Sequence, residues 1–219
     1  MLVVGHRANS LRVALFYRWS GVKAVEVDVT GEKGLLVARH GPPSIRRASI
    51  LGRIFSAIDY RLFYRDPLGR AERLSSWISK LGEMGFEVLV LDVKPDLDPL
   101  ELIGEVESSG WGGRVVVTGW DHRLLARIKE LAGYETLATF TILPVNLVGL
   151  VREARADGVS IRLDLALRPG VVESLKKEGL KVAVWTVNDV AQARRVASLG
   201  VDAIVSDRPD LVFRALNSS

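Results

Sequence analysis

Short runs rich in β-branched residues alternate with amphipathic helical segments along the whole chain of 219 residues. This alternation is typical of βα units built around a parallel sheet. The predicted strands are Leu2–Gly5, Ala24–Val29, Val88–Val93, Arg114–Thr118, Glu135–Phe140, Val159–Leu163, Val182–Thr186 and Ala203–Ser206. The predicted helices are Asn9–Ser20, Glu72–Met84, Leu97–Ser109, Asp121–Ala132, Val145–Asp157, Gly170–Glu178, Asn188–Leu199 and Pro209–Leu216.

A strand followed by a helix, repeated in this way, predicts an α/β fold of the (β/α)8 TIM-barrel type with a small insertion after the second strand. No remaining segment is large enough for a second domain, so residues 1–219 are predicted to form one domain. An open doubly wound sheet is the alternative, but it usually has fewer strands. Asp121 and Asn188 are predicted helix N-caps. Gly179 and Gly200 follow helices as C-cap glycines do.

One segment after the second strand interrupts the alternation of strands and helices. Residues 34–40 predict a strand-like extension, and residues 41–70 form an insertion rich in arginine and aromatic residues. The simpler interpretation of the insertion is a solvated basic lid. The sharper hypothesis is peripheral contact with an anionic membrane, because apolar residues recur at helical spacing beside arginines. These apolar residues are Ile50, Leu51, Ile54, Phe55 and Ile58.

Composition narrows the class of protein. Apolar residues make up 48% of the chain, which is an ordinary globular value, and no apolar run is long enough to cross a bilayer. The first residues lack the features of a signal peptide, so a cytoplasmic location is expected. The absence of cysteine excludes disulfides, thiolate catalysis and Cys-ligated metals. The formal net charge of +4 favours anionic ligands, but no nucleic-acid-binding motif accompanies it.

Polar and charged residues gather where the predicted strands end. In a parallel barrel these ends share one rim, and residues at i and i+2 of a strand share one face. Glu26 and Asp28 can therefore chelate one cation together. The other residues at this rim are His6, Arg7, His40, Asp92, Lys94 and Trp185.

These residue types suit phosphoryl chemistry. Carboxylates hold a hard divalent cation, basic groups neutralise phosphate charge, and imidazoles exchange protons with attacking and leaving oxygens. The alternative is that Glu26 and Asp28 only form ion pairs with Arg7 or Lys94 in an inactive barrel. His122 is expected to be a structural residue in the first turn of a helix. Asp207 is expected to cap the last helix and to lie outside the site.

The order of these motifs resembles the glycerophosphodiester phosphodiesterase family. It reads HR at residues 6–7, ExD at 26–28, a histidine at 40, DxK at 92–94, WTVND at 185–189 and GVDAIVSDRPD at 200–210. The resemblance therefore extends over most of the chain. It implies a metal-dependent hydrolase that converts a small-molecule glycerophosphodiester into a glycerol phosphate and an alcohol.

The resemblance also implies a role for each rim residue. His6 and His40 would form the acid/base pair. Mg²⁺ or Ca²⁺, with Mn²⁺ as a further candidate, would be bound by Glu26, Asp28 and Asp92. The phosphate would be contacted by Arg7 and Lys94, and Trp185 would pack against the glycerol-like part.

Three residues depart from the family pattern. Ala8 replaces a glycine, Gly41 replaces an aspartate after the second histidine, and Asp92 replaces a glutamate whose side chain is one methylene longer. Two rival functions follow from the sequence. One is a phospholipase D-like or cyclising phosphodiesterase that acts on an intact lipid. The other is a non-catalytic barrel that binds phosphodiesters.

Overall fold

A closed barrel of parallel strands forms the centre of the molecule. The computed structural model describes residues 1–32, 34–40 and 72–217. Within these residues, each barrel strand pairs in parallel with the next, and β1 pairs with both β9 and β2, which closes the barrel. Its strands are β1 (Leu2–Gly5), β2 (Ala24–Glu32), β4 (Val88–Val93), β5 (Arg114–Gly119), β6 (Glu135–Phe140), β7 (Gly158–Arg162), β8 (Lys181–Trp185) and β9 (Ala203–Ser206).

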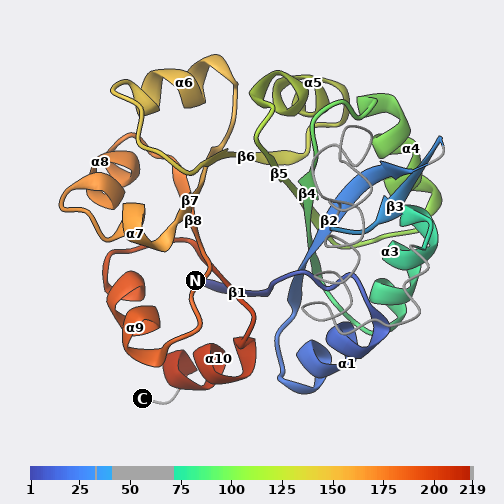
Figure 1. Ribbon diagram of the computed structural model, residues 1–219, viewed down its shortest axis with the longest axis horizontal. Helices are drawn as coiled ribbons and strands as arrows, with labels where there is room; N and C mark the ends of the chain where they lie inside the picture. The colour runs from blue at the N-terminus through green and yellow to red at the C-terminus, as the bar shows by residue number, and fades with distance from the viewer. Residues whose placement is uncertain (33, 41–71, 218–219) are drawn as a thin grey trace, which may run out of the picture.

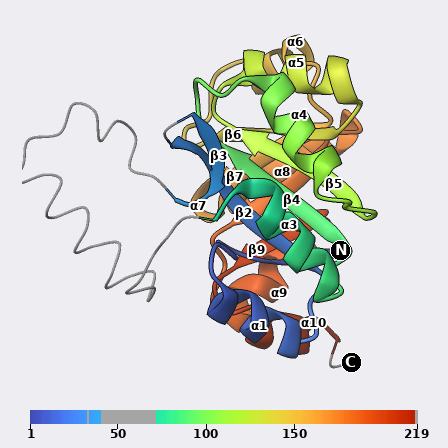
Figure 2. The same cartoon turned by 90° about the vertical axis from the view of Figure 1, so that its right-hand side faces the viewer.

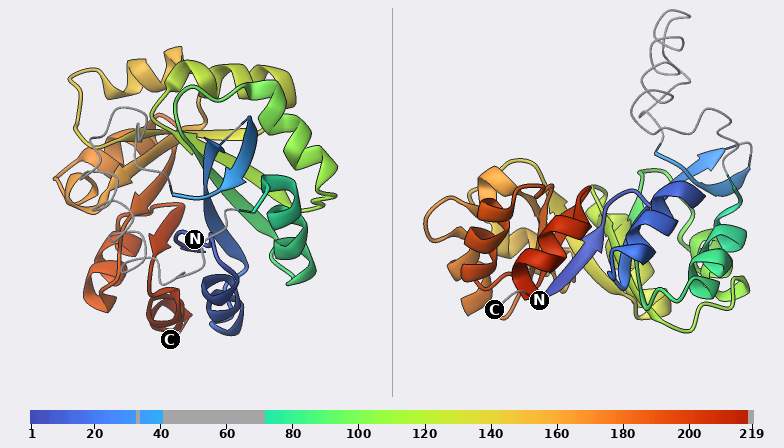
Figure 3. Two further views of the ribbon diagram at one scale, coloured as in Figure 1. Left: turned by 45° about the vertical axis from the view of Figure 1, so that its right-hand side comes forward. Right: turned by 90° about the horizontal axis from the view of Figure 1, so that it is seen from below.

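Helices surround this barrel as an outer ring (Figures 1 and 3). They are α1 (Leu11–Trp19), α3 (Leu74–Glu83), α4 (Pro99–Ser108), α5 (His122–Ala132), α6 (Leu147–Glu153), α7 (Leu163–Ala166), α8 (Val171–Lys177), α9 (Val190–Ser198) and α10 (Pro209–Asn217). None of the helices in the described part of the chain has both the length and the apolar character needed to span a bilayer.

The predicted (β/α)8 barrel is confirmed, with two local differences. Strand β2 runs three residues beyond its predicted end at Val29, because it pairs there with the antiparallel strand β3 (Leu35–Ala38). The short helix α7 was not predicted, since a single turn is too short to show helical periodicity. The insertion at residues 41–70, together with its proposed membrane contact, lies outside the described residues.

Alternation along the strands separates two apolar clusters. Odd-numbered residues of β2 and β4, such as Val27 and Leu91, pack outward against the helices. Even-numbered residues, such as Ala24 and Val90, pack inside the barrel. Because successive residues of a strand face opposite sides, Glu26 and Asp28 continue the inward-facing series that Ala24 begins.

Most of the predicted helices begin and end within two residues of their predicted bounds, whereas α6 ends four residues before its predicted end at Asp157. The Asp121 carboxylate accepts hydrogen bonds from backbone N–H groups of the first turn of α5, as expected of an N-cap. Gly179 and Gly200 have φ angles of 74° and 79°, the left-handed conformation that ends α8 and α9. The prediction for Asn188 was wrong, because Asp189 caps α9.

Candidate active site

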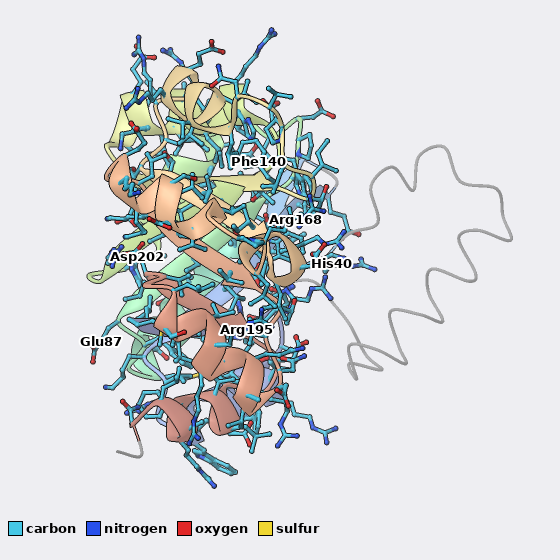
Figure 4. All side chains as sticks on the ribbon, turned by 90° about the vertical axis from the view of Figure 1, so that its left-hand side faces the viewer. His40, Glu87, Phe140, Arg168, Arg195 and Asp202 are labelled. Atoms are coloured by element: carbon cyan, nitrogen blue, oxygen red, sulfur yellow. The ribbon has the colours of Figure 1, made fainter. Side chains whose placement is uncertain are left out.

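The site lies at the end of the barrel where the strands terminate. Figure 2 shows β3 and α7 at this end and the N-terminus at the other. A cavity of about 720 Å³ opens here and continues into the barrel. Its lining includes all of the site residues predicted from the sequence: His6, Arg7, Glu26, Asp28, His40, Asp92, Lys94 and Trp185. In Figure 4 His40 lies at this end, opposite Glu87 and Asp202.

Three carboxylates form a compact cluster in the cavity. Glu26, Asp28 and Asp92 each offer an oxygen within 4.8 Å of the others. The register of β2 and β4 explains this, because Asp28 pairs directly with Asp92. Glu26 and Asp28 are only 5% and 2% exposed. Burial and the neighbouring charges of Asp28 and Asp92 raise the pKa of Glu26. Hard, closely spaced oxygen donors of this kind fit Mg²⁺ or Ca²⁺.

Lys94 provides one positive charge beside this cluster. Its Nζ donates a hydrogen bond to Oδ1 of Asp28 at 2.6 Å and another to Asp92. Burial lowers the pKa of Lys94, but the charges of the two aspartates outweigh this and raise it. Asp28 therefore forms ion pairs with both predicted partners, closely with Lys94 and at 3.9 Å with Nε of Arg7. One ammonium group and one guanidinium group face three carboxylates, so the negative charge of the cluster is only partly neutralised within the described residues.

His6 is paired with the carboxylate of Asp207. Its Nδ1 lies 2.7 Å from Oδ1 of Asp207, and its Nε2 lies 3.9 Å from Oε2 of Glu26. Asp207 was expected to cap the last helix and to lie outside the site; this was wrong, because its carboxylate contacts His6 and Asn188. The Tyr17 hydroxyl donates to the His6 carbonyl at 2.6 Å and fixes the backbone.

His40 is held by the hairpin that follows β2. The Arg39 N–H donates to the Asp28 carbonyl at 2.9 Å, and Nδ1 of His40 lies 2.8 Å from Oδ1 of Asp28. Burial raises the pKa of Asp28, but the hydrogen bond from His40 and the charge of Lys94 outweigh this and lower it. A carboxylate beside Nδ1 keeps the proton on that nitrogen. In both histidines, therefore, Nδ1 is the nitrogen bonded to a carboxylate.

Asn9 is a further residue of the candidate site, and it was not predicted from the sequence. Its Nδ2 donates to Oδ2 of Asp28 at 2.9 Å, and its Oδ1 accepts the Asp28 N–H at 3.0 Å. The nearby Arg7 has a φ of 54°, and its N–H donates to Oε2 of Glu26 at 2.6 Å. The loop after β1 thus orients two of the three carboxylates. The signal in the sequence was the shortness of this loop, which keeps Asn9 at the rim beside His6.

Two tryptophans line another part of the cavity. Trp120 follows β5 and Trp185 ends β8, and their ring centroids are 6.3 Å apart in an edge-to-face arrangement. His122 lies in the first turn of α5 and packs against Phe140, as its structural interpretation predicted.

The fold and cavity define a (β/α)8 barrel with acidic residues and histidines at the carboxyl ends of its strands. The family model described as "Glycerophosphoryl diester phosphodiesterase family" matches residues 87–211, which is more than half of the chain. The chain therefore belongs to this family of phosphoric diester hydrolases.

Individual relatives agree with this assignment. The glycerophosphodiester phosphodiesterase of Caldanaerobacter subterraneus is 27% identical to this chain over an alignment of 242 residues. The alignment covers 97% of this chain and 96% of the relative. YhdW of Bacillus subtilis is 30% identical to this chain over 105 residues. This match covers 45% of this chain and 42% of YhdW, which is less than half of the length of YhdW. A solved phosphodiesterase of Oleispira antarctica has a TM-score of 0.80 and 18% identity, over 99% of this chain and 97% of that chain. At that identity the likeness shows a shared fold.

Proposed function

We propose that this protein hydrolyses glycerophosphodiesters to glycerol 3-phosphate and an alcohol, with a divalent cation, His6 and His40. The observation that carries the proposal is the buried carboxylate cluster between two histidines that each have a carboxylate partner. The Caldanaerobacter relative bears the name of this activity, and the Oleispira structure was solved with the product sn-glycerol-3-phosphate. We extend that substrate class to this chain.

Glu26, Asp28 and Asp92 would hold the cation, which we propose to be Mg²⁺ or Ca²⁺, with Mn²⁺ as a further candidate. When bound, such an ion supplies Lewis-acid stabilisation of negative charge on phosphate oxygens. The raised pKa of Glu26 is consistent with this role, because it reflects burial and, after that, the negative charges of Asp28 and Asp92, and a bound cation would offset both effects. Asn9 would keep the Asp28 carboxylate in a fixed orientation.

Arg7 and Lys94 would bind the phosphate in this proposal. Both line the cavity beside the carboxylates, and both contact Asp28. A cationic group at this position stabilises charge on the phosphate oxygens as the ester bond breaks. Trp185, on the opposite side of the cavity, would pack against the carbon skeleton of the glycerol.

The two histidines would divide the proton transfers. The Asp207 carboxylate forms one hydrogen bond with His6 and accepts the other from the uncharged Asn188. His6 is therefore the group in these two hydrogen bonds that can carry the compensating positive charge. Asp28 shares its charge among His40, Lys94 and Asn9. We therefore assign proton abstraction from the attacking water to His6, because Asp207 stabilises the imidazolium that forms. His40 would donate a proton to the leaving alcohol.

The test is product analysis by ³¹P NMR with a panel of glycerophosphodiesters and Mg²⁺, Ca²⁺ or Mn²⁺. Glycerol phosphate and the free alcohol are the expected products. His6→Ala and His40→Ala should each lower turnover by about 10²- to 10⁴-fold, the scale of general acid/base catalysis. His122→Ala is the matched control and should retain full turnover. If either His6→Ala or His40→Ala were as active as His122→Ala, the proposed mechanism would be wrong.

A further inference from the structure

The turn between β1 and α1 carries several site residues on a backbone that must be held in place. We call residues 6–9 the β1–α1 turn, which consists of His6, Arg7, Ala8 and Asn9. Arg7 has a φ of 54°, in the left-handed region that residues other than glycine rarely adopt. Such a conformation persists only where the surrounding structure imposes it. The groups that hold this turn therefore also set the directions of its side chains.

Backbone hydrogen bonds attach the turn to the two strands that flank β1. The His6 N–H donates to the Ser206 carbonyl of β9 at 2.9 Å. The Ala8 N–H donates to the Glu26 carbonyl of β2 at 2.7 Å. Because β1 pairs with both β9 and β2, the turn spans the place where the barrel closes. These bonds use the N–H groups of the residues on either side of Arg7, and the carbonyls of the same two residues have other partners.

Two aromatic side chains from different helices bind these carbonyls. Tyr17 of α1 donates its hydroxyl to the His6 carbonyl at 2.6 Å. Trp77 of α3 donates its indole N–H to the Ala8 carbonyl at 2.8 Å, and this hydrogen bond is buried. An indole has one donor, and a buried donor without a partner costs free energy. The bond to Ala8 therefore fixes the indole and the turn together.

The Ala8 side chain adds an apolar attachment at the same point. It is fully buried in the apolar cluster that also contains Trp77. Glycine, the usual residue of the family at this position, would lack the methyl group and would have more backbone freedom. The departure from the family pattern at Ala8 thus strengthens the hold of the core on the end of the turn that leads to Asn9.

We propose that Trp77 is a positioning residue for the cation site, because through the Ala8 carbonyl it holds the turn that sets Asn9 against Asp28. This inference rests on the proposed function. Asn9 follows Ala8 directly and makes two hydrogen bonds to Asp28, so the position of the turn determines the position of these bonds. Without the indole hydrogen bond, the left-handed turn would relax and the Asp28 carboxylate would lose its fixed orientation. Groups that orient a ligand residue in this way raise metal affinity.

The test is isothermal titration calorimetry of the full chain with Mn²⁺. Trp77→Phe keeps an aromatic ring in the core but removes the donor. It should weaken Mn²⁺ affinity about fivefold, the ratio that the net free energy of one hydrogen bond produces. Trp111→Phe is the matched control, because Nε1 of Trp111 is buried and has no hydrogen-bond partner among the described residues. The same substitution there should leave the affinity unchanged, whatever either variant does to the stability measured by urea unfolding.

A double-mutant cycle with Asn9→Ala separates positioning from packing. If Trp77 acts through Asn9, then Trp77→Phe should weaken affinity by less than about twofold in the Asn9→Ala background, since the two effects are coupled. A purely structural role would give the same loss in both backgrounds. Ala8→Gly provides a second route if Trp77→Phe does not fold. It keeps the carbonyl but frees the backbone, and should weaken Mn²⁺ affinity about two- to fivefold.

The outcomes distinguish this inference from the proposed function. A folded Trp77→Phe with wild-type affinity, or an equal loss with and without Asn9, would overturn the inference alone. If Trp77→Phe did not fold, wild-type affinity in Ala8→Gly would overturn it in the same way. A wild-type protein that bound none of Mn²⁺, Mg²⁺ and Ca²⁺ would instead overturn the proposed cation site.

Discussion

The Nδ1 atom of His6 lies 2.7 Å from Oδ1 of Asp207, which joins the first and last strands of the barrel at the cavity. Asp207 is itself held by Asn188, whose Oδ1 accepts the Asp207 N–H at 2.9 Å and whose Nδ2 donates to Oδ2 of Asp207. The Ser206 hydroxyl donates to the same Asn188 oxygen at 3.1 Å. The loop after β8 therefore positions the carboxylate that orients His6.

Replacing Asp207 with asparagine should lower kcat about ten- to a hundredfold, less than the loss of His6 itself. The amide keeps the shape of the side chain but removes the charge that stabilises a protonated imidazole. Asp210→Asn is the control, because Asp210 pairs with Arg208 at 2.9 Å in the first turn of α10. Steady-state kinetics measures both variants. Equal kcat values for the two would show that Asp207 plays no part in the reaction.

Asn9→Ala should weaken divalent-cation binding about 10- to 100-fold. Asn9 makes two hydrogen bonds to Asp28, and groups that orient a ligand residue typically contribute this much to metal affinity. Isothermal titration calorimetry with Mn²⁺ measures the effect independently of turnover. Asn217→Ala serves as the control, since Asn217 donates only to the Phe213 carbonyl in α10 among the described contacts. Unchanged affinity in Asn9→Ala would contradict the role of Asn9.

Asp92→Asn should reduce cation affinity strongly, whereas Asp92→Glu should preserve it. The amide removes one of three charged oxygen donors. Glutamate restores the longer side chain that is usual in the family, and the cavity provides room for it. Calorimetric titrations of the two variants with Mg²⁺, Ca²⁺ and Mn²⁺ make the comparison. Asp92→Asn with wild-type affinity would exclude Asp92 as a ligand.

Glu105 stabilises the start of α3 from the neighbouring helix α4. Its Oε2 accepts the Ser75 N–H at 2.8 Å, and its Oε1 accepts from Nε of Arg73 at 2.8 Å. Burial would raise the pKa of Glu105, but these hydrogen bonds outweigh it and lower the pKa. A carboxylate with a depressed folded-state pKa contributes stability above its unfolded-state pKa of about 4.3, and that contribution is lost as the pH falls through the folded-state value.

Glu105→Gln should therefore lower the free energy of unfolding at pH 7 by about 1 kcal/mol, the typical net value of such a hydrogen bond. The difference from the wild-type protein should shrink as the pH falls below about 4. Urea unfolding at several pH values measures it. Glu107→Gln, an exposed position on the same helix, should have little effect at any pH. A difference that grew on acidification would contradict the assigned role.

The barrel was predictable because each strand carries a short β-branched run that is bounded by a helix. The β2–β3 hairpin was only partly predictable. Residues 34–40 suggested an extended strand, but nothing local in that segment specifies that it folds back antiparallel on β2. Tertiary pairing determines that geometry. For α7, burial of Leu165 and Ala166 stabilises a single turn that has no periodicity of its own.

The residues at the strand ends were predictable because a parallel barrel brings them to one rim. Asp207 also follows a strand end, but an aspartate before a helix is so common a cap that its contact with His6 was not apparent. Asn188 was predicted to cap α9, but its side chain instead bonds to Asp207, and Asp189 is the cap. Such choices depend on distances across the barrel, which sequence spacing does not specify.

The most direct test of the central claim is the rate of glycerophosphodiester hydrolysis as divalent cations are removed and restored. After treatment with EDTA, turnover should fall to background and should return when Mg²⁺, Ca²⁺ or Mn²⁺ is added in excess. The double variant with Glu26→Gln and Asp28→Asn should stay inactive at every cation concentration, because it lacks two of the three charged donors. Full turnover in the presence of the chelator would contradict the account.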